Sequence, residues 1–334
     1  MLEWFRKSRK SAPAGAEGTG RTEAWPADRM AWRAGTGLPI PAWEAQSWPV
    51  TTDAEALHAH ANGLAATWLD ALAQALPERH ARAESANFML LSAMDRRTAD
   101  ALLRYLERSR TRVLATLPGV AGGDGHGKTV VVVFGSEDGY YRYVAHYGTP
   151  SSEQEAFSGG MFIDAGYGHF VFTHSPFEQM EPVVVHELTH CLVRHLPLPA
   201  WLNEGLAVNT ERRFAPRPAR FLPNELEYLF GRFWNASTIQ EFWSGKSFLR
   251  PDEGQPLSYE LARILVQLLD KDYDVLRRFC EAARREDAGE GAAQDVLGAS
   301  LSGLAEVVLG PGEWAPQPAA WATGTERGQF HGTS

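Results

Sequence analysis

The residues best suited to chemistry in this sequence are His186, Glu187 and His190, which form the pattern His-Glu-x-x-His. On an α-helix two residues four apart project from the same face, so both imidazoles can bind one metal ion. Glu187, the next residue round the helix, is then expected beside the ion, where a carboxylate can take a proton from bound water. The pattern predicts a zinc site that carries its own general base.

The sequence around this pattern predicts a buried helix. Apolar residues cover most of its circumference, which is typical of a helix inside a domain. They are Val183, Val184, Val185, Leu188, Cys191, Leu192, Val193 and Leu196. Pro182 is expected in the first helical turn, where a missing N–H is tolerated, and Pro197 ends the run.

Zinc needs a third protein ligand if a fourth position is to stay open for water. We expect it to be Glu204, near the start of a second helix that follows a short loop bounded by prolines. Two rivals exist. His195 lies five residues beyond His190, which turns it about 140° away from the ligand face. Glu211 lies two turns further along the second helix.

The two helices resemble those of a known family. His186-Glu187-Leu188-Thr189-His190, followed by Trp201-Leu202-Asn203-Glu204-Gly205-Leu206-Ala207, is similar to the gluzincin zinc peptidases, and among them to the bacterial peptidase-MA-like domain proteins of unknown substrate. The resemblance runs from about Phe88 to Trp314 and is specific at these helices. It implies Glu204 as the third ligand. The short interval after His190 and the lack of a Gly-x-Met-Glu-Asn sequence mean that aminopeptidase activity is not implied.

The resemblance also implies supporting roles. Ligand imidazoles usually donate their second N–H to a carboxylate or carbonyl, and many gluzincins use an Asp four residues after the Glu ligand. Val208 occupies that position here, so Asn209 or a main-chain carbonyl is expected to substitute. Gluzincins often place a downstream Tyr or His against the developing oxyanion. Tyr259 is therefore a candidate catalytic residue, with a tyrosine of the core or of a helix face as the alternative.

The expected elements predict an α+β, zincin-like fold. A small mixed β-sheet with an edge hairpin precedes the metal helix, and a mostly helical C-terminal lobe follows it. The predicted domains are a flexible arm rich in Trp, Ala and Gly over 1–48, a peptidase-like domain over 49–312 and a flexible tail over 313–334. Within the domain we expect a helix over 53–76, an α/β part over 86–196 and a helical part over 197–312. The arm is expected either to dock its tryptophans on the domain or to bind a partner.

The hairpin is predicted from two apolar runs, Gly160 to Ala165 and His169 to Thr173, joined around Gly166-Tyr167-Gly168. In gluzincins an edge strand in this position pairs with the extended substrate backbone. A purely structural hairpin is an equal alternative.

Composition narrows the possible partners. The net charge is −9, with 32 Lys and Arg scattered among 41 acids, which argues against nucleic-acid binding. No run approaches the ~20 apolar residues of a membrane span, and no signal peptide is apparent, so a cytoplasmic protein without membrane partners is expected. Two cysteines, Cys191 and Cys280, do not indicate a disulfide framework.

These observations favour a zinc-dependent peptidase that acts on a peptide or protein substrate. Zn²⁺ on His186, His190 and Glu204 would activate water and polarise the scissile carbonyl, and Glu187 would be the general base. The alternative is a zinc-stabilised interaction domain without catalysis.

Overall fold

The computed structural model describes residues 22, 30–122, 125–147 and 160–321. It is a mixed α+β fold that contains a five-stranded mixed sheet. The strands are β1 (Ala81–Glu84), β2 (Phe88–Ser92), β3 (Thr129–Phe134), β4 (Gly160–Ile163) and β5 (His169–Thr173). Their order is β1-β2-β3-β5-β4, with β2, β3 and β5 parallel and the two edge strands antiparallel to their neighbours.

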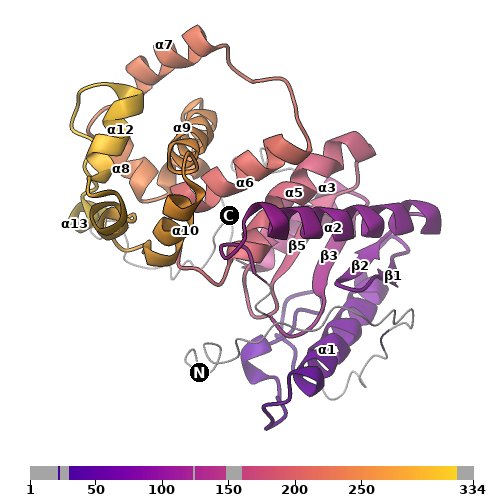
Figure 1. The fold of residues 1–334 in the computed structure, drawn as a ribbon. Helices are drawn as coiled ribbons and strands as arrows, with labels where there is room; N and C mark the ends of the chain where they lie inside the picture. Colours follow the sequence, from indigo (N-terminus) through magenta and orange to yellow (C-terminus); the bar gives the residue numbers. More distant parts are fainter. Residues whose placement is uncertain (1–21, 23–29, 123–124, 148–159, 322–334) are drawn as a thin grey trace.

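The central strands are apolar on both faces because both faces are covered. β3 is Thr-Val-Val-Val-Val-Phe, a β-branched run that packs well in a sheet buried on two sides. Alternate residues belong to two separate core clusters, with Val131 in one and Val130 in the other. α1 (Ala54–Ala75) lies on one face, and α2 (Arg96–Thr116) with α5 (Phe177–Val193) lies on the other (Figure 1).

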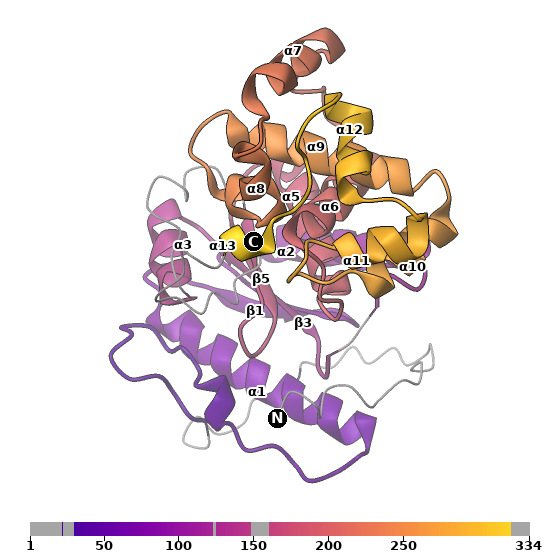
Figure 2. The ribbon, with the colours of Figure 1, turned by 90° about the vertical axis from the view of Figure 1, so that its left-hand side faces the viewer.

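The C-terminal part is helical and packs against α5 (Figure 2). It consists of α6 (Ala200–Phe214), α7 (Pro223–Phe233), α8 (Thr238–Trp243), α9 (Gly254–Leu269), α10 (Tyr273–Ala282), α11 (Glu290–Ala292), α12 (Leu301–Leu309) and α13 (Pro318–Trp321), together with shorter helical turns. α6 and α9 approach closely at Gly205, where an added Cβ would lie 2.5 Å from Val266 Cγ2 and 2.6 Å from the Ala262 carbonyl oxygen. A glycine directly after Glu204 is therefore needed for this packing.

The expectation for Pro182 was wrong. α5 begins at Phe177, so Pro182 lies inside the helix and not in its first turn. A proline there removes one hydrogen bond of the helix, although its φ remains helical. The same stretch is supported by Tyr105 Oη, which donates to the Glu181 carbonyl at 3.1 Å.

Parts of the predicted arm and tail contribute to the core. Trp43 is buried in the cluster around α1, and Trp314 is buried in the cluster around α5 and α9. Trp243 Nε1 donates to the Trp314 carbonyl at 2.7 Å. Most of residues 1–29, with Trp25, and residues 322–334 lie outside the described residues.

Both cysteines are free thiols. Among the described residues no single helix is both long enough and apolar enough to cross a membrane. One pair, Glu290–Leu297 with Leu301–Leu309, passes that test of length and composition only as two pieces bent by 89°.

Candidate metal centre

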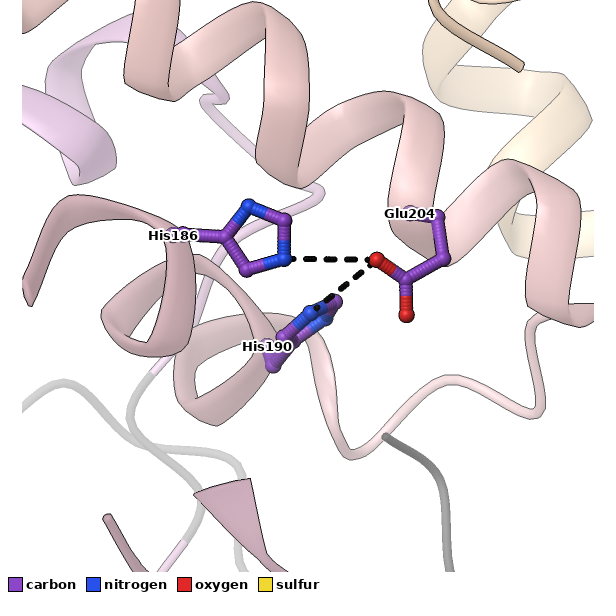
Figure 3. Close-up of side chains that lie close together, drawn as sticks. All are labelled: His186, His190 and Glu204. Atoms are coloured by element: carbon purple, nitrogen blue, oxygen red, sulfur yellow. Dashed lines mark ion pairs between the residues drawn. The ribbon is translucent and has the colours of Figure 1, made fainter. Parts of the chain in front are cut away.

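Two consecutive helices bring His186, His190 and Glu204 together. α5 presents both imidazoles on one face, with ring centroids 4.8 Å apart. α6 directs the Glu204 carboxylate toward both rings, as Figure 3 shows. Glu204 Oε2 lies 3.3 Å from His186 Nε2 and 3.5 Å from His190 Nε2. In the described part of the chain this is the only group of three or more His, Cys, Asp or Glu side chains that could share a metal ion.

The distances within this group and the burial of its atoms fit a bound metal. Two ligand atoms that are each about 2.1 Å from one tetrahedral ion stand about 3.4 Å apart, close to the observed 3.3 and 3.5 Å. His190 Nε2 and Glu204 Oε2 are buried and make no hydrogen bond of good geometry with any described residue, so the ion pairs with Glu204 are what hold the imidazole nitrogens in place. A cation held by the three side chains would bind these same atoms.

The electrostatics of the group favour positive charge at its centre. Burial opposes ionisation of Glu204, but His190 and His186 outweigh it and lower the pKa of Glu204 to about 2. Burial also opposes the charged form of His186, yet Glu204 and Glu211 raise the pKa of His186 well above its usual value. Protons and a metal ion therefore compete for the same ligand atoms, so metal binding should release protons.

A second layer of contacts orients both imidazoles. Glu211 Oε2 accepts a hydrogen bond from His186 Nδ1 at 3.1 Å, and Asn203 Oδ1 accepts one from His190 Nδ1 at 3.1 Å. Because each Nδ1 is used in this way, each Nε2 is left to face Glu204. Glu211, considered above as a rival ligand, belongs to this second layer.

The expected substitute for the missing Asp was wrong. The Asn209 side-chain amide donates to the main-chain carbonyls of Gly205 and Arg263, at 2.7 and 3.0 Å, and so ties α6 to α9. A main-chain carbonyl is not used either, because side chains accept from both ligand imidazoles. Val208, at the position where many gluzincins have Asp, is buried as a core residue.

Glu187 lies beside the three ligand side chains with one oxygen unused. Its Oε2 is buried and has no hydrogen-bond partner among the described residues. Burial raises the pKa of Glu187, while His186 and His190 act in the opposite direction. The main chain of Phe162, on β4, also acts to lower the pKa of Glu187. A buried carboxyl of raised pKa is suited to accept a proton and return it.

Tyr259 lies at the edge of the group, whereas His195 lies outside it. The Tyr259 ring centroid is 6.3 Å from that of His186 and 5.2 Å from that of Phe248. Burial, reinforced by Glu204, raises the pKa of Tyr259 well above its ordinary value, so the hydroxyl keeps its proton. His195 is exposed beyond the end of α5 and does not belong to the ligand group.

Comparisons with models of protein families and with curated proteins gave no match. The resemblance to gluzincins therefore stays an expectation drawn from the sequence of α5 and α6. The function must be argued from the chemistry of the site.

We predict that the second layer tunes metal affinity. Glu211→Ala and Asn203→Ala should each weaken zinc binding about 10- to 100-fold, because an imidazole without its acceptor loses orientation and basicity. Competition with a zinc indicator at fixed pH measures the affinity. Asn209→Ala is the matched control on the same helix and should leave the affinity unchanged. Equal weakening by all three substitutions would show that the effect is general destabilisation of α6.

Proposed function

We propose that this protein is a zinc-dependent peptidase of the gluzincin type, with His186, His190 and Glu204 as ligands and Glu187 as general base. One juxtaposition carries the proposal. Glu204 Oε2 lies at a tetrahedral separation from both imidazole Nε2 atoms, and the group adjoins a buried carboxylate, Glu187, that has an unused oxygen. Zinc sites that only stabilise a fold usually fill four positions with protein ligands. The described residues supply three, which favours catalysis over a purely structural site.

Each residue then has a distinct task. Zinc, when bound, would supply Lewis acidity toward the scissile carbonyl and a water molecule of lowered pKa. Glu187 would take a proton from that water and later deliver it to the leaving amine. Tyr259, which keeps its O–H proton, would donate a hydrogen bond to the developing oxyanion.

The proposal includes a zincin-like placement of the substrate along β4. This strand is an antiparallel edge of the sheet and packs closely on α5, where an added Cβ at Gly160 would lie 2.5 Å from Val183 Cγ1. An extended peptide can add to such an edge through main-chain hydrogen bonds. The arrangement supports a peptide or protein as the substrate.

A peptide-cleavage assay tests the proposed activity. The zinc-loaded chain, incubated with a broad mixture of unfolded proteins and short peptides, should generate new termini that mass spectrometry detects. A zinc chelator should stop the cleavage, and added zinc should restore it. Absence of cleavage by folded protein carrying about one zinc per chain would contradict the proposal and favour a zinc-stabilised interaction domain.

A further inference from the structure

The turn between β4 and β5 is held from one side by a residue far away in the sequence. Gly166, at the turn, has a φ of +71°, and an added Cβ there would lie 2.2 Å from Trp43 Cγ. Trp43 is buried and packs edge-on against Trp68, with ring centroids 5.4 Å apart. Its ring is also 5.4 Å from that of Tyr167. Trp43 therefore presses directly on the backbone of the turn and is itself fixed by α1.

The other side of the turn is held from the metal helix. Arg194 is the first residue after α5, and its Nη1 lies 3.7 Å from Asp164 Oδ1. An added Cβ at Gly168 would lie 2.0 Å from Arg194 Nη1 and 3.1 Å from Phe162 Cζ. The guanidinium therefore lies against the backbone of Gly168, next to the Phe162 ring. A side chain at position 168 would displace either the Arg194 guanidinium or the Phe162 ring.

The Phe162 ring links the turn to β4, the strand that packs on the helix carrying the proposed general base Glu187. Phe162 is buried, with its ring beside Gly168, and its main chain lies close enough to the Glu187 carboxyl to act on the pKa of that group. At the start of β4, an added Cβ at Gly160 would lie 2.5 Å from Val183 Cγ1 on α5, so strand and helix are in close contact there too. A shift of the turn would be transmitted through a packed side chain to the strand that faces Glu187.

We propose that Trp43 and Arg194 are positioning residues of the site. They hold the turn Asp164–Gly168 from opposite sides, and through the Phe162 ring they fix β4 relative to Glu187. The contacts described above join both residues to the hairpin, so removing either should displace β4 without loss of zinc. The expected effect of either substitution on turnover rests on the proposed peptidase function, whereas the expected effect on the hairpin does not.

Trp43→Ala tests the first contact, with Trp48→Ala as the matched control. Trp48 comes from the same segment and packs on His60 of α1, 4.9 Å between ring centroids. In Trp43→Ala, amide hydrogen exchange in residues 160–173 should be about tenfold faster or more, with zinc stoichiometry unchanged. Trp48→Ala should not change exchange there, and Trp43→Phe should restore part of the protection. Equal exchange in the two alanine variants would overturn the proposal.

Arg194→Ala tests the contact of the guanidinium with Gly168. This variant keeps the proposal testable even if Trp43→Ala does not fold. Exchange in the hairpin should again increase, and Arg194→Lys should recover little because an ammonium cannot lie flat on Gly168. Full recovery with Lys would overturn this part of the proposal.

If the parent chain cleaves peptides, both alanine variants should raise KM and lower kcat, together reducing kcat/KM about tenfold or more. Loss of folded protein alone would lower apparent kcat at constant KM. A parent chain that cleaves nothing would refute the function, while the exchange result would still decide the positioning role.

Discussion

Glu187→Gln should reduce peptide hydrolysis by a factor of about 10² to 10⁴ while zinc content and folding change little. The substitution keeps the side-chain volume and polar contacts but removes the proton acceptor. In the structure the Glu187 carboxylate adjoins the ligand group without being part of it, so metal binding should survive. The loss should appear in kcat and in kcat/KM together, because the carboxylate acts in the transition state.

The measurement is steady-state cleavage of a substrate found in the peptide assay, with zinc per chain determined for the same preparation. Chelator-sensitive cleavage that persists at full rate in Glu187→Gln would exclude the general-base mechanism. Loss of zinc together with activity would instead indicate that Glu187 is a ligand.

Glu204→Ala should lower zinc affinity by more than about 100-fold, beyond the effect of any second-layer substitution. Glu204 Oε2 is the atom that faces both imidazoles, so its loss leaves two ligands on a single helix. Elemental analysis after dialysis against a competing chelator should show about one zinc per parent chain and almost none in the variant. His190→Ala should behave in the same way.

His195→Ala is the control for these ligand substitutions, because His195 is exposed beyond the end of α5. It should retain its zinc. Retention of zinc in Glu204→Ala together with loss in His195→Ala would overturn the ligand assignment.

The candidate ligands could be predicted from sequence because the geometry that a shared metal ion requires is set by short spacings along the chain. Four-residue spacing on one helix fixes the relation of His186 to His190 whatever surrounds them. The second layer could not be predicted, because its partners depend on the angle at which α6 crosses α5. Asn203 and Glu211 lie one residue before and seven residues after Glu204, and no spacing rule marks them as partners of the imidazoles.

The fold was predictable where burial produces a clear pattern. β5 has the bounds expected from its apolar run, His169 to Thr173, and α1 lies within the helix expected over 53–76. β1 was missed because Ala-Arg-Ala-Glu has little strand character and is held by charges. Arg82 pairs with Glu84 and, at 3.0 Å, with Asp70. α3 (Glu137–Val144) was missed because its tyrosines are residues typical of strands.

The metal centre and the hairpin beside it differ greatly in how far apart their parts lie along the chain. The whole ligand group with its second layer falls within two adjacent helices, and its longest contact, from His186 to Glu211, spans 25 residues. Such low contact order allows early assembly, because little loop entropy opposes it. The turn, by contrast, needs Trp43, which is distant in sequence. On the proposed function, a partly folded chain could therefore capture zinc before the hairpin is in place, so zinc occupancy alone would be a poor measure of native protein in a preparation.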